Sequence, residues 1–198
     1  MELNELECRF IEACFSADYA INPFKSRHAY IAGGAVRDLL AGKPLADIDV
    51  FVETWGNISC RHVSIVESVF GDNTLYFYTN THPRAHASFE RQGGDYYEES
   101  GFASYRSKQM PNINIVLVNG TVEEIIKNFP ISCSRIGIGA SSRKAGELVV
   151  GDKWDEFVKY NVIHYNSDTD SRYLDKIRKK YPERAYTWIK EPVDSIPF

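Results

Sequence analysis

The sequence lacks the features that define secreted, membrane-spanning and zinc-binding proteins. Its 198 residues include four cysteines, which are scattered and form no CxxC pair, so we expect neither a disulfide framework nor a zinc site. No apolar run approaches the roughly 20 residues of a membrane span. The first residues are acidic and lack the basic start and apolar core of a signal peptide. We therefore expect a soluble, cytoplasmic protein.

An excess of positive charge is also missing. The net charge of −4 excludes a protein that binds nucleic acid over its whole surface. Repeats, linkers and low-complexity blocks are absent, and a hydrophobic share of 43% is ordinary for a folded chain. We expect a single domain over residues 1–198, with a core at about 25–140 and a C-terminal helical appendage at about 151–198.

The spacing of apolar residues predicts an α/β chain. Helical periodicity and capping residues predict helices at 3–19, 35–41, 58–70, 121–127, 154–160 and 171–180. Short apolar or alternating runs predict strands at 28–32, 47–53, 75–79, 113–118, 131–138 and 147–150. The polar stretch 82–109 predicts a long loop or an irregular insertion.

Two glycines stand between the first predicted strand and the helix that follows it. Gly33 and Gly34 would let the backbone approach phosphate groups, because neither carries a Cβ. The helix that follows would offer its N-terminal amides to the same anion. Arg37 lies one turn into that helix and could hold the phosphates with its forked guanidinium. The order strand, glycine pair and helix thus predicts a triphosphate site.

A pair of aspartates on the next predicted strand supplies candidate metal ligands. Asp47 and Asp49 are two residues apart, so on a strand their carboxylates project from one face, while Ile48 points into the core. Both carboxylates could bind one Mg²⁺ or bridge two. Glycine pairs and paired aspartates are each common alone, at turns and at solvated strand edges. Their combination predicts a nucleotide-and-metal site.

The run from Tyr30 to Val52 resembles the head domain of the CCA-adding tRNA nucleotidyltransferase and bacterial poly(A) polymerase family, within the polymerase-β superfamily. The resemblance implies a mixed β-sheet flanked by helices. It implies transfer of a nucleoside monophosphate from a nucleoside triphosphate (NTP) to a hydroxyl on RNA, with tRNA as one candidate acceptor and Mg²⁺ or Mn²⁺ as cofactor. The implied site residues are Gly33, Gly34 and Arg37 at the triphosphate and Asp47 and Asp49 at the metal, with Asp38 tying the loop together.

Several features depart from the family pattern. The third carboxylate of active members falls on the predicted strand that carries Asn112 and Asn114, and an amide can ligate Mg²⁺ only weakly and cannot accept a proton. Asn114 is therefore the candidate third catalytic position. A second, weaker sequence similarity to the family spans residues 128–133. The Glu-Asp-x-x-Arg motif that reads the nucleobase is missing, and so is the long helical body that grips tRNA, which argues against faithful CCA addition.

Three interpretations remain open. The chain could be an active nucleotidyltransferase, a nucleotide- or RNA-binding regulator that has lost turnover, or a toxin-like transferase that modifies tRNA or protein with a base supplied by the substrate. Two basic segments could serve RNA binding or could simply be solvated surface. They are the aromatic-rich stretch 82–108 and the amphipathic helix at 172–180.

Overall fold

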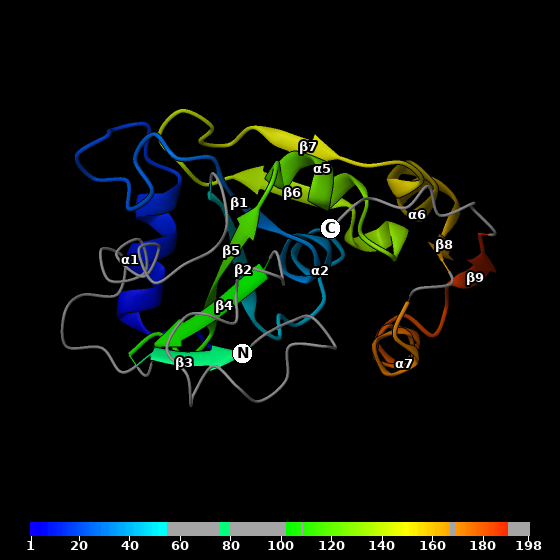
Figure 1. Ribbon diagram of the computed structural model, residues 1–198. Coiled ribbons are helices and arrows are strands. Elements are labelled where there is room, and N and C mark those ends of the chain that lie inside the picture. The colour runs from blue at the N-terminus through cyan, green and yellow to red at the C-terminus, as the bar shows by residue number, and fades with distance from the viewer. Residues whose placement is uncertain (55–75, 80–101, 108, 167–168, 190–198) are drawn as a thin grey trace.

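The computed structural model of the protein describes residues 1–54, 76–79, 102–107, 109–166 and 169–189 (Figure 1). Seven strands form one sheet in the order β3-β4-β5-β2-β1-β6-β7. Their bounds are β1 (Ala29–Ala32), β2 (Ile48–Thr54), β3 (Tyr76–Thr79), β4 (Phe102–Ser107), β5 (Ile113–Asn119), β6 (Ile136–Gly139) and β7 (Leu148–Val150). The β2–β5 pair is parallel and the other pairs are antiparallel, which confirms the expected α/β fold with a mixed sheet.

Helices cover both faces of the sheet. Their bounds are α1 (Glu5–Cys14), α2 (Gly34–Leu40), α5 (Val122–Lys127), α6 (Trp154–Tyr160) and α7 (Ser171–Lys180). Side chains of α1, α2, α6 and α7 share one apolar core with alternate residues of β1, β2 and β5. The opposite face of the sheet packs against α5 (Figure 1). None of the helices in the described ranges is long and apolar enough to cross a membrane.

The central strands place three chain segments at one end of the sheet. Because β1 is antiparallel to β2 and β2 is parallel to β5, β1 ends where β2 and β5 begin. In this register Ala32 lies beside Asp49, and Asp49 lies beside Asn114. The interior residues Val50 and Ile115 are fully buried, which fixes the register, since a slip by one residue would turn them outward.

Helix α1 is shorter than its predicted span of 3–19. It begins with a capping box between Asn4 and Glu7, as its sequence favours. It ends at Cys14 because the side chain of Asn22 donates hydrogen bonds to the carbonyl oxygens of Cys14 and Ser16, at 2.8 and 3.0 Å. The following chain therefore folds back instead of continuing the helix.

Two other segments differ from the sequence-based expectation. Within the expected strand 131–138, the short 3₁₀ helix η3 (Ser132–Ser134) precedes β6. The hydroxyls of Ser132 and Ser134 are bound to other segments, and these bonds favour a turn over a strand. Within the expected loop 82–109, residues 102–107 form β4, because β3 and β5 pair with it on either side. The rest of that loop up to residue 101, and the expected helix 58–70, lie outside the described residues.

The C-terminal segment is not purely helical. Besides α6 and α7 it contains β8 (Val162–Tyr165) and β9 (Ala185–Trp188), which pair in parallel as a separate two-stranded sheet. Helix α7 connects these strands, as parallel pairing requires of an intervening segment. The expected helical appendage is thus a mixed unit whose helix α7 stands beside the N-terminal half of the chain (Figure 1).

Candidate functional site

The turn between β1 and α2 requires glycine. Gly33 has φ 71° and ψ −124°, a conformation that L side chains avoid. Its amide donates to the carbonyl oxygen of Ile136 on β6 at 2.8 Å, and its carbonyl accepts from the Arg37 amide at 3.1 Å. A Cβ at Gly33 would lie 3.5 Å from the ring of Phe129, in the segment that echoes the family pattern. Two strands and a packed aromatic ring therefore hold the glycine turn in place.

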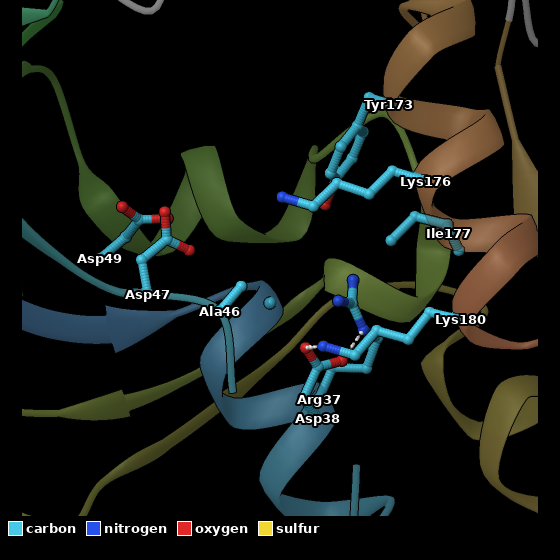
Figure 2. Close-up of a pocket in the computed structure, with 10 residues that line it drawn as sticks. Arg37, Asp38, Ala46, Asp47, Asp49, Tyr173, Lys176, Ile177 and Lys180 are labelled. Atoms are coloured by element: carbon cyan, nitrogen blue, oxygen red, sulfur yellow. Dashed lines mark hydrogen bonds and ion pairs between the residues drawn. The ribbon is translucent and has the colours of Figure 1, made fainter. Parts of the chain in front are cut away.

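The structure brings Asp49 and Asn114 into direct contact. The side-chain amide of Asn114 donates a hydrogen bond of 2.8 Å to Oδ1 of Asp49. Ile48 is 4% exposed and packs in the core, so the carboxylates of Asp47 and Asp49 lie together on the other side of the strand (Figure 2). Asn112 instead donates its backbone amide to Glu7 of α1 at 2.7 Å. Of the two asparagines, Asn114 is the one that adjoins the aspartates.

A pocket of about 230 Å³ joins the glycine turn to the aspartates. It is lined by Gly34, Arg37, Asp38, Ala46, Asp47, Asp49, Tyr173, Lys176, Ile177 and Lys180. The first six residues come from α2, the loop that follows it and the start of β2, and the last four come from α7. In Figure 2 the side chains of α7 face the aspartates across the pocket. The basic helix at 172–180, for which the sequence left phosphate contact and solvent exposure open, thus forms a wall of the candidate site.

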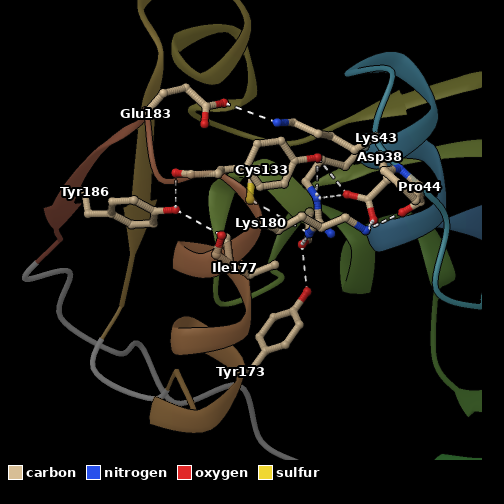
Figure 3. A network of polar contacts seen from close by, with 12 residues as sticks. Asp38, Lys43, Pro44, Cys133, Tyr173, Ile177, Lys180, Glu183 and Tyr186 are labelled. Carbon is tan, nitrogen blue, oxygen red and sulfur yellow. Dashed lines mark hydrogen bonds and ion pairs between the residues drawn. The ribbon is translucent and has the colours of Figure 1, made fainter.

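Arg37 lines this pocket (Figure 2) and belongs to a buried polar network around Asp38 (Figure 3). Its Nε donates to Oδ1 of Asp38 at 2.7 Å, and its Nη1 donates to the hydroxyl of Ser134 at 3.0 Å. The Tyr181 hydroxyl also donates to Asp38 Oδ1, at 2.7 Å, and the ammonium of Lys180 donates to Oδ2. Arg37 therefore lines the predicted triphosphate site, but two of its nitrogens bind groups within the protein.

Comparison with known proteins gives this arrangement a family context. Residues 29–114 match the model of the poly A polymerase head domain. The matched range runs from the first residue of β1 to Asn114, so it contains the glycine turn and both aspartates. The chain has the fold of a polymerase-β-type nucleotidyltransferase head domain.

Solved structures show the same head-domain fold. The Thermotoga maritima CCA-adding enzyme complexed with tRNA is 19% identical, with a TM-score of 0.50 over 83% of this chain and 37% of that one. A CCA-adding enzyme in apo form I is 15% identical, with a TM-score of 0.50 over the same shares. The chain thus spans little more than a third of the length of these enzymes. No curated protein sequence matches it.

The charge state of the head domain's buried network follows from Asp38. Burial alone would raise the pKa of this carboxyl, but hydrogen bonds from Arg37, Lys180 and Tyr181 and the charge of Arg37 bring it below its ordinary value of 3.8. Burial and the hydrogen bond to Asp38 raise the pKa of the Tyr181 phenol. Asp38 is therefore an anion at neutral pH. It accepts hydrogen bonds from two cations and a neutral phenol, and so links α2 to the end of α7.

The donor set of the pocket suits a magnesium ion that is partly held by its substrate. Mg²⁺ takes oxygen ligands, often one or two carboxylates completed by water and substrate phosphates. Asp47 and Asp49 supply two such carboxylates on one wall. Across the described ranges, no group of three or more His, Cys, Asp or Glu side chains could hold a metal. The two carboxylates of Asp47 and Asp49 fit a metal that also takes phosphate ligands.

Sequence reasoning missed the contribution of α7 as a wall. Tyr173, Lys176, Ile177 and Lys180 recur at helical spacing on one face, which is a pattern visible in the sequence. That pattern shows which side chains share a face, but it does not show what the face covers. The aromatic and basic residues at 82–101 lie outside the described residues, so their predicted nucleic-acid contacts stay a prediction.

Proposed function

We propose that the protein transfers a nucleoside monophosphate from an NTP to a hydroxyl on RNA, with Mg²⁺ or Mn²⁺ as cofactor. The convergence of Gly34, Asp47 and Asp49 in one pocket carries the proposal. The head-domain fold supports nucleotidyl transfer, and one solved structure of this fold is complexed with tRNA. The charge pattern agrees, because a carboxylate pair beside a buried guanidinium suits a metal-bound polyphosphate.

Each residue of the pocket has a part in this proposal. Asp47 and Asp49 hold the metal, which supplies neutralisation of phosphate charge when it is bound. The backbone at Gly34 lets the phosphates approach closely, and Arg37 adds positive charge beneath them. Asn114 donates to Asp49 and so orients that carboxylate. In this arrangement the residues would bind and position the phosphates, without any covalent role for the protein.

Asn114 limits how the acceptor can be activated. Its amide has no basic site, so it cannot remove the proton of the attacking hydroxyl. That proton would leave to solvent or to a phosphate oxygen of the substrate. We therefore expect slow transfer compared with a site that has a third carboxylate.

The position of Asn114 also favours a second candidate function. An amide beside Asp49, where a third carboxylate would complete the site, suits a regulator that binds nucleotide or RNA without turnover. A toxin-like transferase with a base supplied by its substrate would use the same pocket. The regulator differs from the two transferases in label transfer, and a toxin-like transferase that modifies protein differs in acceptor, so one assay distinguishes these outcomes.

The test is label transfer from NTPs to total RNA. The protein is incubated with each α-labelled NTP, total cellular RNA and Mg²⁺ or Mn²⁺, beside the Asp47→Ala/Asp49→Ala double variant. We expect transfer to fall by on the order of a thousandfold in the variant, because the metal-holding carboxylates are gone. Asp155→Ala removes an exposed carboxylate of α6 and serves as the matched control.

Each result selects one candidate. Label transfer that persists in the double variant overturns the assignment of the metal site. Binding of NTP by the wild-type protein without transfer favours the regulator. Label that appears on protein instead of RNA favours the toxin-like transferase.

A further inference from the structure

Helix α7 is built to present one polar face to the pocket. Leu174 and Ile177 are 7% and 1% exposed and anchor the helix in the core. Tyr173, Lys176 and Lys180 follow at i, i+3 and i+7, so they share the neighbouring face, and all three line the pocket. The sequence of α7 thus determines both its anchorage and the side chains that it offers to a ligand.

Polar contacts fix this helix at both ends of the pocket. The Lys180 ammonium donates to Asp38 and, at 2.6 Å, to the carbonyl oxygen of Pro44 (Figure 3). The Tyr173 hydroxyl lies 3.0 Å from the hydroxyl of Ser134. Lys176 stands between these two contact points in the sequence. The backbone that carries Lys176 is therefore held against the head domain.

Lys176 differs from three other cations of α7, which are paired with carboxylates. Lys180 is paired with Asp38, Arg178 with Asp175 and Arg172 with Asp170. Within the part of the chain that the structure describes, Lys176 makes neither an ion pair nor a hydrogen bond through its ammonium. Figure 2 shows this ammonium pointing from α7 into the pocket, towards the side that holds the aspartates. The Lys176 ammonium therefore lies where it can contact a ligand bound in the pocket.

We propose that Lys176 binds the polyphosphate tail of the NTP from the side opposite to Asp47 and Asp49. This inference rests on the proposed function. The aspartates can approach phosphates only through a metal, whereas an ammonium contacts phosphate oxygens directly and offers three donors. A polyphosphate held between the two walls could contact the aspartates through the metal and the Lys176 ammonium directly. A backbone phosphate of the acceptor RNA has the same chemistry, and the experiment separates these two sources.

The experiment measures binding to the full chain by calorimetric titration in Mg²⁺. The probes are ATP, inorganic tripolyphosphate and a short single-stranded oligoribonucleotide. We expect Lys176→Ala to raise the Kd for ATP and for tripolyphosphate by about tenfold, since one charge-assisted contact is lost. Lys176→Arg keeps the charge and should retain most of the affinity. Lys179→Ala removes a neighbouring exposed cation of α7 that does not line the pocket, and should leave both Kd values unchanged.

The outcomes separate this inference from the proposed function. If the wild-type protein binds neither ATP nor tripolyphosphate, both are overturned. If it binds them and Lys176→Ala binds equally well, only the role of Lys176 is overturned. A loss confined to the oligoribonucleotide would assign Lys176 to the acceptor, which also overturns the proposal. Because Lys176 is exposed, its variants should melt at the wild-type temperature.

Discussion

The two walls of the pocket are built in different ways. The first wall consists of α2, the short loop that follows it and the start of β2, and its geometry follows from local backbone preferences. The second wall is a face of α7, far along the chain, and depends on buried contacts to α2. The first wall carries the carboxylates and the second carries the lysines.

One side chain of the first wall contacts two residues of the second. Asp38 belongs to α2, yet it accepts hydrogen bonds from Lys180 and Tyr181 at the end of α7. It also pairs with Arg37, which lines the pocket. The first wall is therefore a local motif, and the buried Asp38 carboxylate is the group of α2 that binds both Lys180 and Tyr181 of the second wall.

Removing the Asp38 carboxylate should destabilise the whole domain. In Asp38→Ala, the Arg37 guanidinium would stay buried without its counter-ion, and Lys180 and Tyr181 would lose their shared acceptor. Breaking a buried ion pair by removing one partner costs about 3 to 5 kcal/mol. We expect a loss of this size in the free energy of unfolding, measured by urea denaturation.

The matched control is an exposed ion pair between nearby segments. Glu183 follows α7, and its carboxylate lies 3.8 Å from the ammonium of Lys43, which follows α2 (Figure 3). The Glu183 side chain is 52% exposed, so Glu183→Ala should cost less than about 1 kcal/mol. Equal losses in the two variants would mean that Asp38 does not connect the walls.

The first wall should be sensitive to backbone strain at Gly33. Gly33→Ala places a Cβ on a residue with φ 71° and ψ −124°, which should cost roughly 2 kcal/mol. Gly42→Ala is the control, because φ there is 62° and nothing lies within 4 Å of the added Cβ. We expect a loss of roughly 1 kcal/mol there. Only Gly33→Ala should also weaken ATP binding, and a similar loss of binding in Gly42→Ala would contradict a specific role for the turn.

The first wall could be predicted from the sequence because each of its features is local. A glycine pair after an apolar strand predicts the turn, and the two-residue period of a strand puts Asp47 and Asp49 on one face around buried Ile48. Strand pairing then adds Asn114 beside Asp49 at the position that the sequence predicted. Their roles in catalysis and in metal and nucleotide binding remain proposals.

The second wall could not be predicted, because its placement depends on long-range contacts. The sequence predicts α7 within one residue of its bounds, but not the contact between Lys180 and Asp38. Strands β4, β8 and β9 were missed for the same reason. Each is short, and its formation depends on a partner strand elsewhere in the chain. Local propensity identifies α7, but only tertiary packing shows that it faces the nucleotide site.

Adding a third carboxylate beside the first wall should raise the rate of nucleotidyl transfer. Asn114→Asp adds a third carboxylate beside Asp49, which could accept the proton of the attacking hydroxyl. We expect label transfer to RNA to rise by about tenfold or more in Mg²⁺, the low end of general-base effects. Asn112→Asp is the control, because Asn112 contacts Glu7 of α1 instead of Asp49. No gain in the first variant, or an equal gain in the control, would count against Asn114 as the third position.

The smallest expected effect is a fall in the free energy of unfolding at acidic pH, as the Asp38 carboxylate becomes protonated. The pKa of Asp38 in the folded protein lies below its ordinary value of 3.8, so its contribution to stability is complete at neutral pH. That contribution begins to fall as the pH drops to the unfolded pKa, and it is lost as the pH passes through the lower folded pKa. Between about pH 5 and about pH 3, the free energy of unfolding should therefore fall more steeply in the wild-type protein than in Asp38→Asn. The two proteins share every other acidic group, so the difference in slope reports the Asp38 carboxylate. Parallel slopes would show that the carboxylate charge does not hold α7 to α2, and the second wall would then depend on its apolar anchor residues and its other polar contacts.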